Sequence, residues 1–404
     1  MADIINDSKY VLTPPEEIER RINALQLSLK NERREAALLI QNVDLYYFTG
    51  TMQDAALFVP AHGEPILMVR KSTERARNES PLKHVLDMQS TKQLPELIRG
   101  HHGLLPQSLG MELDVVPVNL YRRYLSLLGI KDVFDVSPLV RRIRSIKSPF
   151  ELKLLQGAGE IGRKVYGETP RFISEGITEI ELAGKLTEVA FSLGHLNQLR
   201  SRSFNGEMFT WHVITGKSGG ILGHLDAPFN GTGLSPAFPA GAGFRTVRRN
   251  DPILVDFGTC WNGYIADQTR MFSLGQPDSL FLEAYEALQA IEDAILRQTR
   301  PGVRCQDLYQ VSLEEARKLG FANEFLGPDG HKISFVGHGV GLEINEFPFL
   351  AKGHEYPLES GNVFALELKM VFLKKGAVGL ENVVAVTDSG YKKLTTADET
   401  FIIV

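Results

Sequence analysis

The strongest constraint on the fold of this 404-residue chain is a pair of acidic residues on a predicted β-hairpin. Asp256 follows the apolar run 252–255, Asp267 lies in the run 264–272, and the turn-forming pair Asn262-Gly263 lies between them. Depending on the register, the two carboxylates face each other or lie diagonally, roughly 5–8 Å apart. Two unpaired carboxylates that close repel each other and raise one pKa unless a cation holds them. The hairpin therefore indicates a cation site.

A second predicted hairpin repeats this design, because it carries Glu367 and Glu381 on either side of a turn at 374–376. His338 lies between the two acidic pairs in the sequence. Four carboxylates and one imidazole suit Mn²⁺, Fe²⁺, Co²⁺ or Zn²⁺ and disfavour copper. Two such ions about 3.5 Å apart would share a bridging hydroxide as the nucleophile and polarise a scissile carbonyl. The sequence therefore predicts a dinuclear metal centre for amide hydrolysis or closely related chemistry.

Composition narrows the class of protein. Hydrophobic residues make up 43% of the chain and charged residues 23%, as in ordinary globular proteins. A formal net charge of −5 argues against a nucleic-acid-binding protein, which would carry a basic face. The chain has no apolar run long enough to span a bilayer, its start does not resemble a signal peptide, and Cys260 and Cys305 are its only cysteines. We expect a cytoplasmic α/β protein with no membrane or nucleic-acid partner.

The first part of the chain is predicted to form a separate α/β domain. A helical pattern over about 15–32 leads into apolar runs at 36–40 and 45–48, which we interpret as buried strands. Further short apolar runs follow at 56–59 and 65–69, separated by turn residues. Strands mixed with helical segments at this spacing favour an α/β fold.

The boundary between two domains is predicted beside the basic stretch 141–147. Ser148, a proline at the first helical position and Glu151 then form a capping box that begins a helix. We therefore divide the chain into domains at 1–145 and 146–404.

The second domain is predicted to repeat one pattern twice. A capping box at 178–181 begins its second helix, and strands follow. After the first acidic hairpin, helical patterns over 279–299 and 305–319 again precede strands. Two helices followed by strands, twice over, indicate a pseudo-duplicated α+β half-barrel with its active site where the two halves meet.

Four segments resemble the pita-bread metallopeptidases, which include methionine aminopeptidase, aminopeptidase P and prolidase, with creatinase as a metal-free relative. They are 256–270, 337–346, 364–367 and 379–383. The stretch 142–151 also resembles the interdomain junction of the aminopeptidase P, prolidase and creatinase branch.

This resemblance implies an α+β fold in which a creatinase-like α/β N-terminal domain precedes a pita-bread catalytic domain. It implies an Xaa-Pro aminopeptidase-like or dipeptidase-like hydrolase that acts on a small peptide or amide, and commonly a homodimer. It also implies two divalent metal ions, with Mn²⁺ favoured over Co²⁺, Zn²⁺ or Fe²⁺. The implied ligands are Asp256, Asp267, His338, Glu367 and Glu381.

The chain departs from the family pattern at four places. Two histidines that usually contact substrate are replaced by Ala240 and Asn345. Gly379 stands where the family has arginine, and Leu368-Lys369 stands where the family has Pro-Gly after the fourth ligand. Metal binding is therefore better supported than turnover of ordinary proline peptides.

The lost histidines remove groups that could donate to an oxyanion or move a proton. Asn345 can still donate a hydrogen bond through its amide, but it cannot transfer a proton at pH 7. Losing one such donor lowers the rate on the order of 10²–10³-fold if nothing replaces it. We propose His224, in a Gly-rich segment, as the replacement, with an exposed loop histidine as the alternative, whereas His212 lies in a strand-like run and is expected to pack.

Three functions remain open. The first is a dinuclear metallohydrolase resembling aminopeptidase P or prolidase, with His224 and Asn345 as catalytic groups. The second is a family member with other metal-dependent chemistry, such as a small-molecule C–N hydrolase or a lyase, which the loss of both histidines favours. The third is a non-catalytic metal-binding homologue. Four buried acids with no use would be costly to keep desolvated, which argues against the third function and against metal-free catalysis of the creatinase type.

Overall fold

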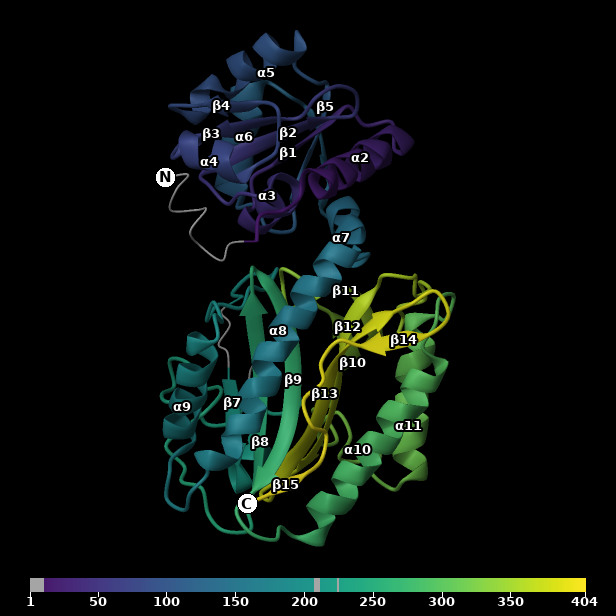
Figure 1. Cartoon of the computed structure of the whole chain (residues 1–404). Helices are drawn as coiled ribbons and strands as arrows, with labels where there is room; N and C mark the ends of the chain where they lie inside the picture. The colour runs from purple at the N-terminus through teal and green to yellow at the C-terminus, as the bar shows by residue number, and fades with distance from the viewer. Residues whose placement is uncertain (1–10, 207–210, 224) are drawn as a thin grey trace. The chain divides into compact units, whose positions relative to one another are not determined.

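The computed structural model describes residues 11–206, 211–223 and 225–404 (Figure 1). The chain divides into two compact units, which are described separately below. Unit 1 comprises Met1–Arg144 with Ser203–Asn205, and unit 2 comprises Ser145–Arg202 with Gly206–Val404.

Unit 1 is an α/β domain built on a six-stranded sheet with the strand order β4-β3-β2-β1-β5-β6. The strands are β1 (Ala36–Leu39), β2 (Ala55–Pro60), β3 (Ile66–Val69), β4 (Val85–Asp87), β5 (Ser108–Met111) and β6 (Asp132–Asp135). The helices are α2 (Pro15–Asn31), α3 (Asn42–Thr49), α4 (Thr73–Glu79), α5 (Leu94–His102), α6 (Val118–Leu128) and α7 (Ser137–Ser145), with a 3₁₀ turn η1 (Thr91–Gln93). The sheet is mixed, since β1 pairs antiparallel with β2 and parallel with β5.

The strand prediction for the apolar run 45–48 is wrong, because this run lies in helix α3. The Gln41 side chain accepts a hydrogen bond from the Asp44 amide at the start of the helix, and Gly50 ends it with a positive φ of 77°. A short apolar run has the same composition in a buried helix as in a buried strand, so its periodicity alone could not decide.

Unit 2 contains a nine-stranded sheet whose main path runs β11-β10-β12-β13-β9-β8-β7, while β14 pairs with β13 and β15 with β9. The strands are β7 (Trp211–Thr215), β8 (Pro252–Trp261), β9 (Tyr264–Ser273), β10 (Phe335–Gly339), β11 (Glu346–Ala351), β12 (Val363–Phe372), β13 (Gly376–Val386), β14 (Tyr391–Lys393) and β15 (Ile402–Ile403). The helices are α8 (Pro149–Glu168), α9 (Glu179–Ser192), α10 (Ser279–Gln298) and α11 (Cys305–Lys318), with 3₁₀ turns η2 (Thr169–Arg171) and η3 (Gly216–Gly220).

Two helix pairs cover this sheet, one for each half. Helix α8 packs along β8 and β9 and α9 packs on β7, whereas α10 packs on β12 and β13 (Figure 1). Both predicted capping boxes are confirmed: the side chains of Ser148 and Thr178 each accept from the amide three residues on, and Glu151 and Glu181 bond back. The pattern of two helices followed by strands, twice over, is thus an α+β domain with two similar halves.

The two acidic hairpins have defined registers. Asn262 and Gly263 have φ angles of 47° and 85°, the positive values that a tight two-residue hairpin turn requires. Asp256 pairs with Thr269, so Asp256 and Asp267 lie diagonally on the same face of the sheet. In the other hairpin, the two glutamates 367 and 381 lie directly opposite each other.

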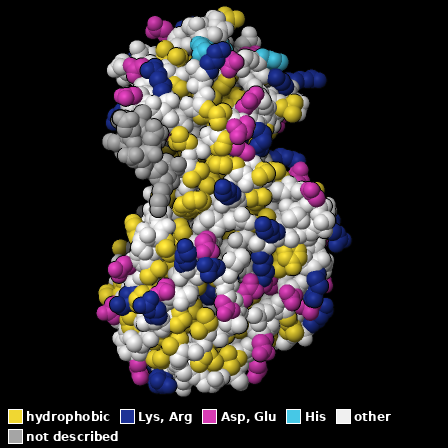
Figure 2. Space-filling model, viewed as in Figure 1, with side chains coloured by type: hydrophobic (Ala, Val, Ile, Leu, Met, Phe, Trp, Pro, Cys, Tyr) yellow, Lys and Arg dark blue, Asp and Glu magenta, His cyan; other side chains and the backbone are white. Residues whose placement is uncertain are grey.

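Charged side chains are interspersed over the face of the molecule drawn in Figure 2, with acidic and basic groups side by side. None of the helices in the described part of the chain combines the length and apolar character that a membrane crossing needs.

His195, which follows α9, gives the fold a dependence on acid. Its side chain is buried, and its Nδ1 accepts a hydrogen bond of 2.8 Å from the Cys260 amide. Burial lowers the pKa of His195 from 6.5 to about 4. Between these pH values His195 binds a proton in the unfolded chain but stays neutral in the folded chain. Its contribution to the free energy of unfolding is therefore fully present above pH 6.5 and is lost as the pH drops towards 4, by roughly 3 kcal/mol in all.

We expect His195→Asn to remove this part of the pH dependence, because the asparagine oxygen can accept from the same amide but does not titrate. Urea unfolding of both proteins at pH values from 7 to 4 measures the effect. If the free energy of unfolding changed with pH in the same way in both proteins, His195 would not be the source of this pH dependence.

Candidate metal centre

The structure brings the five predicted metal ligands together on one face of the unit 2 sheet. Each ligand comes from one of five consecutive strands in the order β10, β12, β13, β9 and β8, and in that order they are His338, Glu367, Glu381, Asp267 and Asp256. The strand registers explain the common face, because Thr269 pairs with both Asp256 and Glu381, and side chains at paired positions lie on the same side.

The ligand atoms form two overlapping groups of three, and within each group they lie within 4.8 Å of one another. We call Asp267, His338 and Glu381 the histidine trio, and Asp256, Glu367 and Glu381 the acidic trio. Ligand atoms around a single ion lie at most about 4.4 Å apart, so each trio has nearly the spacing of one cation site. Glu381 belongs to both, as a bridging carboxylate would.

Lys369 was not predicted as part of this site, but its ammonium group lies in the acidic trio. Its Nζ is 2.9 Å from Asp256 Oδ2, 2.9 Å from Glu367 Oε1 and 2.9 Å from Glu381 Oε2. The side chain is only 1% exposed. Because Lys369 is two residues after Glu367 on β12, the two side chains lie on the same face of the sheet. This spacing was the available signal in the sequence.

Gly379 leaves room for the lysine. It pairs directly with Lys369 across β12 and β13. A Cβ at this position would lie 2.9 Å from Thr269 Cγ2, 3.1 Å from Leu254 Cδ1 and 3.4 Å from Lys369 Cε. A larger side chain at 379 would therefore crowd the space beside Lys369, so two of the four departures from the family pattern are cross-strand neighbours.

The electrostatics of the two trios differ. Burial would raise the pKa of Asp256, but the Lys369 ammonium and His212 hold it well below its usual range. Burial, and then the charge of Asp256, raise the pKa of Asp267 to about 8. Burial and Asp267 likewise raise the pKa of Glu381 well above its ordinary value. Positive charge is therefore supplied to the acidic trio and is lacking in the histidine trio.

The histidine trio fits one divalent ion. Glu381 Oε1 is buried and accepts no hydrogen bond from the described residues, while Thr269 Oγ1 donates to the other oxygen at 2.8 Å. A buried carboxylate oxygen without a donor calls for a cation, and two carboxylates with one imidazole are a normal ligand set for a catalytic ion. The acidic trio does not fit a second ion in the same way, because an ammonium group already bonds all three carboxylates.

Two further side chains reach this site. His212 on β7 pairs with Asp256, and its Nδ1 lies 3.6 Å from Asp256 Oδ2 while its ring packs edge-on against Phe229. It therefore packs, as expected, but it also contacts the predicted ligand Asp256. Asp226 was not predicted; burial, and then the charge of Glu367, raise its pKa.

The other predicted catalytic positions have different surroundings. His224 lies outside the described residues. Asn345 Oδ1 accepts from the Arg202 amide at 2.8 Å, and its Nδ2 donates to the Arg202 carbonyl at 3.2 Å. Ala240 is buried and brings no polar side chain. The roles assigned to His224 and Asn345 stay predictions.

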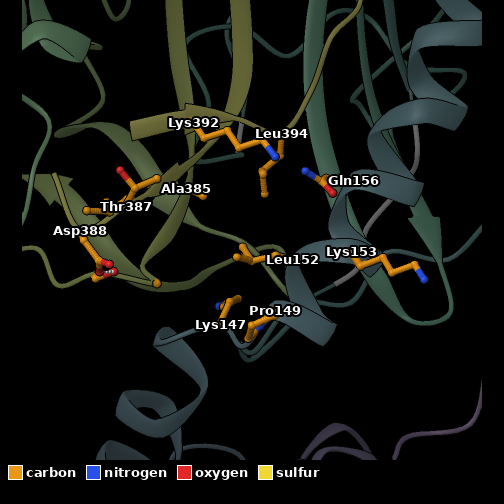
Figure 3. A pocket seen from close by; sticks show the side chains of 13 residues that line it. Lys147, Pro149, Leu152, Lys153, Gln156, Ala385, Thr387, Asp388, Lys392 and Leu394 are labelled. Atoms are coloured by element: carbon orange, nitrogen blue, oxygen red, sulfur yellow. Dashed lines mark hydrogen bonds between the residues drawn. The ribbon is translucent and has the colours of Figure 1, made fainter. Parts of the chain in front are cut away.

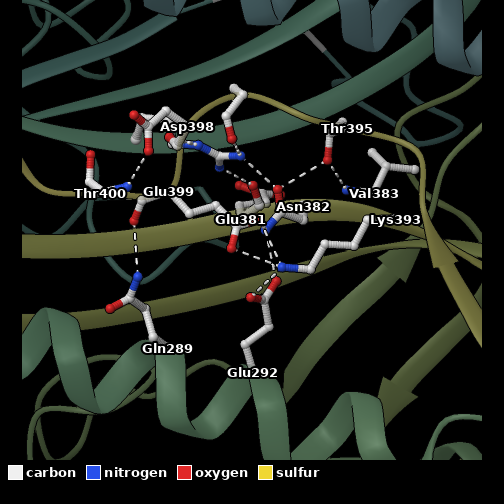
Figure 4. Close-up of polar contacts among 12 residues, drawn as sticks. Gln289, Glu292, Glu381, Asn382, Val383, Lys393, Thr395, Asp398, Glu399 and Thr400 are labelled. Carbon is white, nitrogen blue, oxygen red and sulfur yellow. Dashed lines mark hydrogen bonds and ion pairs between the residues drawn. The ribbon is translucent and has the colours of Figure 1, made fainter.

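A polar network supports Glu381 from the other face of β13 (Figure 4). Arg270 Nη1 donates to the Glu381 carbonyl at 2.8 Å, and Arg270 Nη2 donates to Asn382 Oδ1 at 2.7 Å. Asn382 in turn donates to Glu292 at 2.7 Å, and Lys393 donates to the same glutamate at 2.8 Å. These bonds connect β9, α10 and β14 to β13, the strand that carries Glu381.

A separate cavity of about 480 Å³ lies between the start of α8 and the ends of β13 and β14 (Figure 3). Lys147, Leu152 and Gln156 line one side, and Asp388 and Lys392 line the other. None of the five predicted ligands lines it, so it is distinct from the metal-ligand cluster.

Comparisons with known families agree with this architecture. The sequence pattern of metallopeptidase family M24 matches residues 153–388, and that of the creatinase/prolidase N-terminal domain matches residues 21–146.

Individual relatives are distant but match along nearly their whole length. An Xaa-Pro dipeptidase from Pyrococcus furiosus is 23% identical over 94% of this chain and 99% of its own. A probable dipeptidase PepE from Mycobacterium bovis is 26% identical over 96% of this chain and 97% of its own. Among solved structures, an Xaa-Pro dipeptidase from Bacillus anthracis superposes with a TM-score of 0.82 at 20% identity, covering 96% of this chain and 100% of its own. At this identity the structural likeness establishes the fold alone.

Proposed function

Because this chain belongs to metallopeptidase family M24 and carries a creatinase/prolidase N-terminal domain, we propose that it is a metal-dependent hydrolase of small peptides, with Xaa-Pro dipeptides as the first substrate class. The observation that carries the proposal is the histidine trio, in which His338 and Glu381 are buried and one Glu381 oxygen has no donor among the described residues. The substrate class comes from the relatives, which are described as Xaa-Pro dipeptidases.

In this function, Asp267, His338 and Glu381 would hold a divalent ion, for which Mn²⁺ is our first expectation and Co²⁺, Zn²⁺ or Fe²⁺ are alternatives. Such an ion supplies Lewis acidity towards an amide carbonyl and makes water a stronger nucleophile at neutral pH. Asn345 would donate a hydrogen bond to the substrate carbonyl, and His224 would pass a proton to the leaving nitrogen. A homodimer is part of the proposal.

One alternative has a specific observation in its favour. The position equivalent to one usual histidine is the buried Ala240, and Asn345 bonds the Arg202 backbone. A site with fewer proton donors suits a substrate whose leaving group needs less protonation than a peptide amine does. The alternative function is therefore hydrolysis or elimination at a C–N bond of a small non-peptide molecule.

The test is a substrate panel assayed with each metal ion and after chelation. It pairs Xaa-Pro dipeptides with matched Xaa-Ala dipeptides and adds small cyclic and N-acyl amides. Cleavage of Xaa-Pro dipeptides that stops on chelation and returns with metal supports the proposal. Cleavage of the small amides alone would favour the alternative, and no turnover of any member would reject both functions on this panel.

The role of His224 is tested within the same panel. We expect His224→Ala to lower kcat on the order of 10²-fold with metal content unchanged, because only a proton-transfer group is removed. His62→Ala, which changes an exposed histidine of unit 1, is the matched control. Unaltered turnover in His224→Ala would remove this residue from the mechanism.

A further inference from the structure

We propose that Lys369 is a built-in cation that occupies one of the two cation positions of the centre, so that the chain binds one divalent metal ion where its family is expected to bind two. The ion position is the histidine trio, and the ammonium position is the acidic trio. This inference concerns the composition of the centre and holds whichever substrate the protein acts on.

The hydrogen bonds of Lys369 match the acidic trio completely. An ammonium group has three hydrogens and no acceptor. The three carboxyl groups of the acidic trio each have an oxygen 2.9 Å from Nζ, so each ammonium hydrogen has one acceptor. Charge-assisted hydrogen bonds of this length are the strong ones in proteins. The lysine therefore performs the electrostatic work that a metal ion would perform between the same acids.

The surroundings of the side chain hold it in this position. Lys369 is 1% exposed, and its Nζ lies 5.7 Å from the centre of the Phe229 ring. To make way for an ion, the ammonium would have to leave three carboxylates while still buried, and an unpaired buried charge is strongly destabilising. The structure thus favours an ammonium group that stays between the three carboxylates over one that moves away when metal is added.

Charge gives a further reason against a second ion. One ammonium and one divalent ion leave the four carboxylates with a net charge of −1, and a second divalent ion would turn this into +1 beside a buried ammonium. A second ion would have to share Asp256 and Glu367 with the ammonium, and cations so close repel each other strongly in a buried site. The acidic trio is therefore satisfied without metal, whereas the histidine trio is not.

The first test counts ions without any substrate. Purified protein is loaded with Mn²⁺, Co²⁺ or Zn²⁺, dialysed and analysed for metal per chain. We expect about one tightly bound ion in the natural protein and about two in Lys369→Ala, which vacates the acidic trio. Lys318→Ala is the matched control, since it removes a lysine that pairs with Glu315 on α11, a helix that carries no member of either trio. It should leave the count at about one.

The second test separates the two trios by ligand. Asp267→Asn removes a histidine-trio ligand and should abolish tight metal binding. Asp256→Asn removes an acidic-trio member, which contacts the ammonium and His212 but no metal ion in our assignment, and should retain about one ion. This pair of variants decides the question even if Lys369→Ala fails to fold, because the two changes are chemically identical and 11 positions apart on one hairpin.

Two ions in the natural protein would overturn the proposal, and so would none. A folded Lys369→Ala that still binds one ion would show that the lysine does not exclude the second. Equal loss of metal in Asp256→Asn and Asp267→Asn would contradict the assignment of the trios. A protein that binds one ion but cleaves nothing in the substrate panel would keep this inference and reject the proposed hydrolase.

Discussion

Glu381→Gln is expected to abolish tight metal binding and to reduce hydrolysis by at least about 10²–10³-fold, the scale on which one electrostatic contributor to catalysis is lost. Glu381 is 1% exposed and is the one ligand common to both trios. A glutamine retains one carbonyl oxygen, but its amide nitrogen carries hydrogens and cannot bind a cation. The change therefore removes a negative charge from both cation positions at once.

The same substitution should leave the metal-free protein as stable as before or more stable. Burial and Asp267 raise the pKa of Glu381, and the pKa of Asp267 is itself raised to about 8. Groups with a raised folded pKa stabilise the fold at low pH and lose that contribution as the pH rises through the folded value. Metal-free natural protein should therefore lose stability as the pH rises towards 8, and Glu381→Gln should weaken this loss.

Three measurements test Glu381→Gln: metal content per chain, the rate of hydrolysis, and the melting temperature of the metal-free protein from circular dichroism. Glu292→Gln is the matched control, because Glu292 is also buried but bonds Asn382 and Lys393 outside the ligand set. It should lower the melting temperature and keep the metal. If Glu381→Gln binds as much metal as the natural protein, then Glu381 is not a ligand.

Arg144→Met is expected to destabilise unit 1 by about 3–5 kcal/mol, the usual effect of breaking a buried ion pair from one side. Arg144 Nη1 lies 2.7 Å from Asp44 Oδ1, and the two side chains are 2% and 0% exposed. Methionine fills much of the volume but removes the guanidinium that lies 2.7 Å from Asp44 Oδ1. The double variant with Asp44→Asn should recover part of the loss, because asparagine carries no charge at this buried position.

Two spectroscopic probes locate the effect. The only tryptophans of the chain, Trp211 and Trp261, lie in unit 2, so their fluorescence reports that unit, whereas far-ultraviolet circular dichroism reports both. In urea, Arg144→Met should shift part of the dichroism transition to lower denaturant while the fluorescence transition stays in place. An unchanged dichroism profile would show that the pair contributes little.

Local signals in the sequence predicted the elements that depend on a few neighbouring residues. The capping boxes at Ser148 and Thr178 and the turn at Asn262-Gly263 were predicted correctly, because a cap or a tight turn is completed within four residues. The strand prediction for the apolar run 45–48 was wrong because the neighbouring residues do not distinguish a helix from a strand there. The burial of the run in the tertiary fold decides between them.

The sequence by itself determined which acids and which histidine could form a cation site, and on which hairpins they lie. Only the tertiary structure decided that five strands order them on one face and that Lys369 joins them. Lys369 meets Asp256 across 113 residues of chain and Glu381 across 12. Such contacts depend on strand order and register, which arise when distant segments pair, and no local pattern specifies them. The types of ligand were therefore readable from the sequence, and so was the placement of Lys369 on the same strand face as Glu367, whereas its contacts with Asp256 and Glu381 were not.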